Sequence, residues 1–114
     1  MAVSFQGFQE TVATFAVSGK VTEGEPVKMA GNGMVSTCAA KDDFCGVALA
    51  VRDGLATVQL GGYAVVEYTG TTAPTVGYQS LAADGSGGVQ VQEGGRKLLV
   101  VEVFSDGTVG LMLN

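Results

Sequence analysis

The chain has 114 residues, of which 46% are hydrophobic and only 15% charged, so it is long enough to bury a core without a disulfide framework or a structural metal. Its six Lys and Arg are outnumbered by eleven Asp and Glu, giving a net charge of −5, and they are scattered instead of gathered as in a nucleic-acid-binding protein. The scattered charge leads us to expect no nucleic-acid partner. The longest apolar run is far shorter than a membrane helix, so we expect no membrane partner. The first residues lack a signal-peptide pattern, so we expect synthesis in a reducing cytoplasm.

The first ten residues, MAVSFQGFQE, have no clear periodicity and are predicted to form a flexible N-terminal arm (residues 1–10) that orders only against a partner. Its apolar side chains Val3, Phe5 and Phe8 are candidate contact residues. Residues 11–18 then alternate as a strand does. The more apolar face of this strand is predicted to point inward and consists of Ala13, Phe15 and Val17.

Glycine and asparagine mark a tight turn in the next segment. The sequence AlaGlyAsnGly at 30–33 predicts a hairpin between a strand that starts at Pro26 and a return strand from Met34. Residues 39–44 form a short polar connection whose paired aspartates could begin a single helical turn.

The segment Cys45–Val51 is small and apolar throughout, which is typical of a strand covered on both faces. ArgAspGly at 52–54 predicts a hairpin into Leu55–Leu60. GlyGly at 61–62 permits a bulge or sharp bend before a further strand over Tyr63–Tyr68.

The rest of the chain also reads as strands and turns. Residues 69–77 are predicted to be an exposed loop, because Pro74 prevents regular pairing. Two short strands, Tyr78–Leu81 and Val89–Gln92, flank a flexible tip. The most apolar strands are predicted to be central and to tie the carboxyl terminus into the sheet; they are Lys97–Phe104 and Thr108–Leu113.

These patterns together predict an all-β fold. We expect a single small β-barrel, or a β-tulip or sandwich, built from hairpins, with residues 11–114 forming a single β domain after the arm. No window has the periodicity of an amphipathic helix.

The sequence offers little for catalysis, because it contains no histidine to act as a base. Asp53, Asp84 and Asp106 each precede a glycine, where aspartate stabilises a turn by bonding to the local backbone. Cys38 and Cys45 cannot complete a zinc site and are expected to be free, partly buried thiols, with a structural disulfide as the alternative. We therefore expect no enzyme activity, no cofactor and no metal.

Several short motifs follow one another in a recognisable order. They are GlyGluProValLysMet, a GlyAsnGly turn, CysGlyValAlaLeuAla, ThrValGlnLeuGlyGly, ValGlyTyrGlnSerLeu and AspGlySerGlyGlyVal. Over roughly residues 20–113 this order resembles small tailed-phage head proteins, the decoration-type proteins often encoded beside the major capsid protein, and distantly the lambda-type head decoration proteins.

The resemblance implies a β-barrel or β-tulip body that assembles as a homotrimer on the capsid exterior, with an amino-terminal arm that orders on the shell. Residues 2–9 match that arm, so Val3, Phe5 and Phe8 are the expected capsid contacts. We therefore expect a virion protein that binds the major capsid protein and decorates and stabilises the shell.

A second hypothesis starts from the tyrosines, since aromatic rings combine an apolar face with a polar tip and suit sugars. Here the chain would be a carbohydrate or host-surface binding module displayed on a virion. Its site would be formed by loops 69–77 and 83–88 with Tyr68 and Tyr78.

Overall fold

The computed structural model describes residues 11–113, and every regular element within them is a β-strand, which confirms the all-β prediction. This part of the chain contains no helix long and apolar enough to cross a membrane. The predicted arm, with Val3, Phe5 and Phe8, lies outside the described residues. The strands are β1 (Thr11–Val17), β2 (Pro26–Gly31), β3 (Met34–Thr37), β4 (Gly46–Arg52), β5 (Leu55–Gly61), β6 (Tyr63–Glu67), β7 (Gly77–Ala83), β8 (Val89–Val91), β9 (Arg96–Val103) and β10 (Thr108–Met112).

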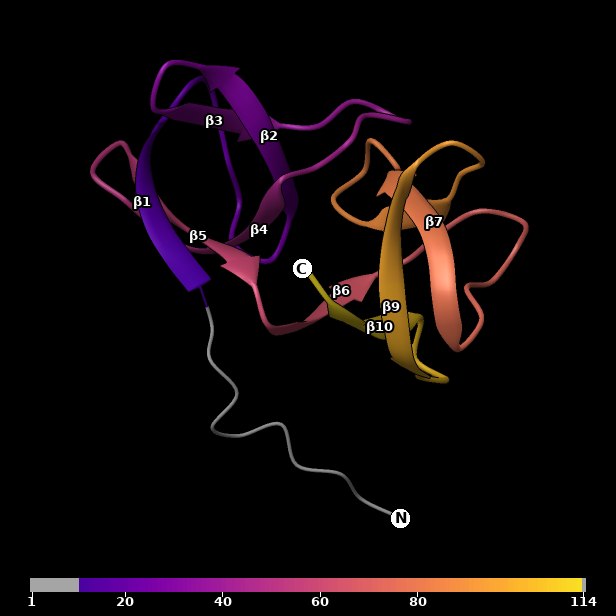
Figure 1. Cartoon of the computed structure of the whole chain (residues 1–114). Coiled ribbons are helices and arrows are strands. Elements are labelled where there is room, and N and C mark those ends of the chain that lie inside the picture. The colour runs from indigo at the N-terminus through magenta and orange to yellow at the C-terminus, as the bar shows by residue number, and fades with distance from the viewer. Residues whose placement is uncertain (1–10, 114) are drawn as a thin grey trace.

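The first five strands form a closed barrel in the order β1-β3-β2-β4-β5, at the left of Figure 1. β5 pairs with β1 in antiparallel fashion, and a short parallel contact between β1 and β3, with Val17 opposite Val35, completes the circle. Phe15 and Val17 pack against the barrel core, so the predicted inward face of β1 is confirmed. That core consists of Val21, Val27, Val35, Ala48, Ala56 and Val58.

The last five strands form a second sheet in the order β6-β10-β9-β7-β8, at the right of Figure 1. β9 and β10 lie inside this sheet, as their apolar sequences predict. A parallel bridge between Tyr68, just after β6, and Val89 of β8 joins the two edges. A second core lies here, formed by Phe44, Val47, Ala64, Val66, Leu81, Val89, Leu98, Val100, Val109, Leu111 and Leu113.

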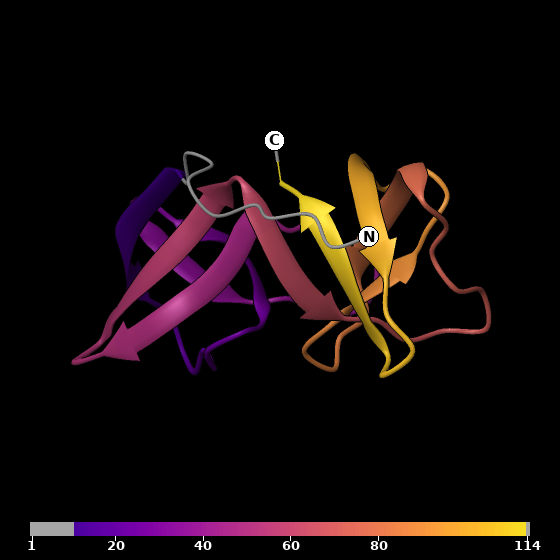
Figure 2. The same cartoon turned by 90° about the horizontal axis from the view of Figure 1, so that it is seen from below.

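The second five strands repeat the pairing scheme of the first five. In each group the first strand pairs with the fifth, the fifth with the fourth, the fourth with the second and the second with the third, all antiparallel. In each group the third strand also meets the end of the first strand in parallel. We call β1–β5 the first unit and β6–β10 the second unit; Figure 2 shows them side by side, with β5 leading directly into β6.

Individual hydrogen bonds recur at equivalent places in the two units. Val17 N donates to Gly54 O at 3.0 Å, and Tyr68 N donates to Gly107 O at 3.0 Å. Each of these glycines ends the turn between the fourth and fifth strands, and each hairpin has a register shift at the same distance beyond its glycine. Positions in the two units can therefore be equated residue by residue around these hairpins.

Phe44 ties the first unit to the second. It lies in the connection between β3 and β4, yet it is only 2% exposed and belongs to the core of the second unit. The guanidinium of Arg96, at the start of β9, lies 5.9 Å from the centroid of its ring. Arg96 also donates to the main-chain carbonyls of Phe44, at 3.2 Å, and of Leu113. One charged side chain thus satisfies carbonyls from both units, which strengthens their contact.

The predicted hairpins at 30–33 and 52–54 are confirmed. In the second of them Asp53 has φ 53° and Gly54 has φ 76°, both in the left-handed region. Two consecutive residues with positive φ form the turn whose twist matches the flanking strands, which is why AspGly is a strong hairpin signal.

Two local predictions are wrong. β4 is not covered on both faces, because only its first three residues are buried, and Leu49 is 42% exposed where the register shift turns it to the outside of the barrel. The connection 39–44 contains no helical turn. Lys41 has φ 72°, and its N–H donates to Ala83 O at 2.8 Å, so the segment is held against the end of β7.

Candidate functional site

The outer face of the first unit carries a shallow groove across β1, β5 and β4. Thr14 lies opposite Thr57, and Thr57 lies opposite Ala50, so a row of small side chains forms its floor. The groove has a volume of about 230 Å³. It is lined by Thr14, Ala50, Arg52, Asp53, Leu55 and Thr57.

Apolar side chains surround this groove and stand open to solvent. Val12 is 48% exposed, Leu49 42% and Leu55 50%. Arg52 and Asp53, at the hairpin end of the groove, are the charged residues of its lining. Apolar surface with so little charge is characteristic of a contact site.

In the second unit the equivalent groove is filled. Gly110 takes the position of Thr57, and Tyr63 takes the position of Val12. A methyl group on Gly110 would collide with the phenolic oxygen of Tyr63 and would lie 2.8 Å from its Cε1, so the ring covers this glycine. Burial raises the pKa of Tyr63, and the negative charge of Glu102 adds to the effect. In the second unit the ring of Tyr63 therefore covers the position that corresponds to the open floor of the groove in the first unit.

Tyr78, on β7, is 71% exposed, and the neighbouring Val76 is 70% exposed. The loop before β7 is anchored on both sides of Val76. Pro74 is buried, and Thr75 donates from its N–H and from Oγ1 to Gln79 Oε1, at 3.4 and 3.0 Å. The loop of residues 69–76 is thus irregular, as predicted, but its last residues are fixed.

Tyr68 has a different setting from Tyr78. It is partly buried against the second core, and its bridge to Val89 places it beside the loop 84–88. That loop and Tyr78 lie at opposite ends of β7. Among residues 11–113, Tyr78 is therefore the one tyrosine with a largely exposed ring.

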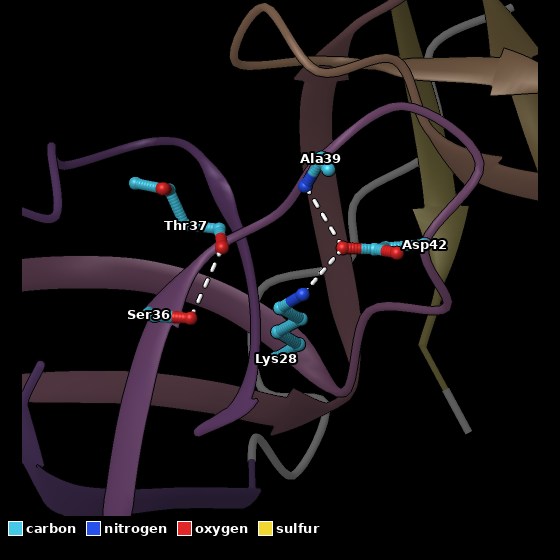
Figure 3. Close-up of polar contacts among 5 residues, drawn as sticks. All are labelled: Lys28, Ser36, Thr37, Ala39 and Asp42. Atoms are coloured by element: carbon cyan, nitrogen blue, oxygen red, sulfur yellow. Dashed lines mark hydrogen bonds and ion pairs between the residues drawn. The ribbon is translucent and has the colours of Figure 1, made fainter.

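An ion pair fixes the connection that leads to Phe44. Lys28 Nζ lies 2.6 Å from Asp42 Oδ2, and the same oxygen accepts a hydrogen bond from Ala39 N at 2.9 Å (Figure 3). The hydrogen bond with Lys28 is the main cause that lowers the pKa of Asp42, and the same hydrogen bond raises the pKa of Lys28. The contact therefore holds the connection in place around neutral pH.

Cys38 and Cys45 are free, partly buried thiols at the two ends of this connection. Burial, followed by the negative charge of Asp42, raises the pKa of Cys38 to about 11. Burial also raises the pKa of Cys45. Because the thiolate is the reactive form, neither cysteine is set up as a nucleophile.

A hollow of about 310 Å³ lies where the glycine-rich loop 85–88 meets Glu25 and Cys38. Two amides of this loop are already satisfied, because Asp84 Oδ1 accepts from Ser86 N at 2.7 Å and from Gly88 N at 3.0 Å. The loop is thus organised by its own aspartate instead of by a bound anion.

Two of the three aspartates that precede glycine bond to the backbone of their own turns, whereas the side chain of Asp53 forms no such bond within residues 11–113. Asp84 does so in the loop 84–88, and Asp106 Oδ1 accepts from Thr108 N at 3.1 Å and from Thr108 Oγ1 at 2.6 Å, which confirms the predicted role of both. Within residues 11–113 no three His, Cys, Asp or Glu side chains are grouped so as to hold a metal.

No known protein family matches the chain, and no curated protein matches it. Sequence reasoning missed the groove, because its floor combines Thr14, Ala50 and Thr57, which are distant in sequence. A signal existed in Leu55, an apolar residue directly after the AspGly turn on the outward side of its strand. The predicted contacts Val3, Phe5 and Phe8 precede β1 and lie outside the described residues.

Proposed function

We propose that this chain is a structural virion protein that binds the outside of an assembled tailed-phage capsid, through the major capsid protein, and stabilises the shell. The order of motifs over residues 20–113, which resembles small phage head proteins, is the starting point. In this proposal the protein is made in the host cytoplasm and acts as a homotrimer on the capsid exterior.

The observation that carries the proposal is the construction of the body. Two five-stranded units are joined by Phe44, which is buried in the second core, and by Arg96, which bonds to carbonyls of both units. Within the described residues 11–113 there is one ion pair, between Lys28 and Asp42. Several apolar side chains are exposed to solvent. A stiff body with a weakly charged, apolar surface suits a protein that acts by contact.

The contact with the capsid is assigned to the arm that precedes β1. Burying a phenylalanine side chain contributes about 2 kcal/mol, so Phe5 and Phe8 together with Val3 would supply a useful part of a modest affinity. A protein that binds the assembled lattice better than free subunits shifts the equilibrium towards the shell. Many such contacts on one shell add to this effect.

The experiment adds the purified chain to shells assembled from the major capsid protein alone. We expect it to co-sediment with the shells and to raise their melting temperature. The double variant Phe5→Ser with Phe8→Ser should bind at least about tenfold more weakly, because two apolar anchors are lost. The matched control, Gln6→Ser with Gln9→Ser, should bind like the native chain. Saturating protein with nothing bound would refute the proposal.

The exposed ring of Tyr78 favours the second candidate function, a carbohydrate or host-surface binding module on a virion. Binding to a glycan array that disappears in Tyr78→Ala would support it. A native chain that binds no glycan would exclude it.

A further inference from the structure

The open groove of the first unit and the exposed Tyr78 of the second unit are complementary. We propose that copies of this chain associate head to tail, with Tyr78 and Val76 of one copy seated in the groove of the next. The contact needs no capsid, so it can be tested separately from the proposed function, although it would supply the homotrimer expected there.

The second unit indicates what a groove at this place accepts. There the ring of Tyr63 lies over Gly110. In the first unit the equivalent residues are Val12 and Thr57, and the shorter valine leaves a groove of about 230 Å³. An aromatic ring supplied by a neighbouring copy would give the first unit the cover that the second unit already has.

The lining of the groove fits a tyrosine. Leu55 and Ala50 offer apolar contact to the ring. Arg52 and Asp53 form no ion pair or side-chain hydrogen bond with any residue from 11 to 113. The guanidinium can therefore lie over the ring face, and the carboxylate can accept the phenolic hydrogen of Tyr78.

The molecule already uses such a pairing internally. At the junction of the units, the guanidinium of Arg96 lies 5.9 Å from the centre of the Phe44 ring. Tyrosine and arginine are also among the residues that most often supply the binding energy of protein interfaces.

Tyr78 and Val76 are presented in a fixed arrangement. Tyr78 belongs to β7 and lies opposite Leu99 of β9, so its backbone is held by the sheet. Val76 follows the buried Pro74 and the hydrogen bonds between Thr75 and Gln79. Little conformational freedom is lost when such a surface binds, which favours association.

The groove and Tyr78 lie in different halves of the molecule. Figures 1 and 2 agree that β7 belongs to the half that lies away from β1 and β5, and the long axis of the chain measures 39 Å. A copy therefore offers its tyrosine to a neighbour and accepts one from another. Contacts between two different surfaces close into rings when the rotation allows, as a trimer requires.

The first experiment measures the oligomeric state of the full chain by analytical ultracentrifugation over a series of concentrations. We expect the native chain to associate, and Tyr78→Ser and Ala50→Glu each to weaken association at least about tenfold. Val65→Ser is the matched control, because Val65 is an exposed apolar residue, 48% exposed, that lies outside both surfaces. This variant should associate like the native chain. Equal melting temperatures of the variants at low concentration would establish that each is folded.

A native chain that stays monomeric at its highest soluble concentration would overturn the proposal, as would Tyr78→Ser associating normally. A cross-linking experiment tests the pairing directly. Tyr78→Cys mixed with Thr57→Cys should form a disulfide-linked heterodimer, while each variant alone should give only background. Loss of association on deletion of residues 1–9, with Tyr78→Ser unaffected, would identify the arm as the occupant of the groove and would also overturn the proposal.

Discussion

Replacing Phe44 by alanine tests whether the two units depend on each other. The side chain is 2% exposed and lies in the second core, although it comes from a connection of the first unit. Truncating a buried phenylalanine to alanine destabilises a protein by about 3–5 kcal/mol, through lost burial and the cavity left behind. The ring face beneath Arg96 is also lost. Against a typical total of about 5–15 kcal/mol, this is a large fraction of the stability.

Urea unfolding followed by circular dichroism measures this loss. With an m-value of about 2 kcal/mol per molar urea, the midpoint should fall by roughly 2 M. Tyr78→Ala is the control, because that ring is 71% exposed, and its midpoint should stay within about 0.3 M of the native value. A loss below about 1 kcal/mol for Phe44→Ala would refute the reasoning that this ring ties the units together.

Three further outcomes are expected. Because the folded-state pKa of Asp42 lies below its ordinary 3.8, its ion pair stabilises the native chain above that value, and this contribution is lost as the pH falls through the lower folded-state pKa. The difference in urea midpoint between the native chain and Asp42→Asn should therefore be present at pH 7 and should disappear as the pH falls below 3.8 and through the folded-state pKa. Gly46→Ala should cost about 1–3 kcal/mol, because a methyl group there collides with the carbonyl of Gln59, whereas Gly31→Ala, with its nearest atom at 3.8 Å, should unfold at nearly the native midpoint. With a pKa of about 11, Cys38 should react with Ellman's reagent at pH 8 at least about tenfold more slowly in the native chain than in urea; equal rates would contradict its burial.

Local turn chemistry made much of the fold predictable. AsnGly at 32–33 and AspGly at 53–54 are strong turn signals, and both stand at hairpins in which Gly33, Asp53 and Gly54 have positive φ. The inward face of β1 followed from alternation alone, because Ala13, Phe15 and Val17 make one face of the strand more apolar than the face of Val12, Thr14 and Ala16.

The tandem repeat was not predictable, because equivalent positions hold different residues. Thr57 corresponds to Gly110, and Val12 corresponds to Tyr63, so the two halves share hydrogen bonds and register but little sequence. The repeat is visible only in how the strands pair, and strand pairing cannot be read from a single sequence.

The junction of the two units and the exposure of Leu49 were not predictable for related reasons. The polar neighbours of Phe44 indicate a solvated connection, yet its ring is taken up by the other core. Leu49 sits in a continuous apolar run, and only the register shift beside it turns the side chain outward. Both results depend on where distant segments meet.

The pairing of the edge strands within each unit affects how well the protein resists aggregation at high concentration. A valine-rich strand with an unpaired edge is a template for amyloid, and the circular pairing of the first unit hides such edges. The second unit has a weaker seam, a single bridge between Tyr68 and the three-residue β8. Local opening of this bridge would expose Val89 and Val91 of β8 to solvent before the other strands. We therefore expect aggregation of concentrated protein to start at the bridge between Tyr68 and β8, the weakest strand contact of the second unit.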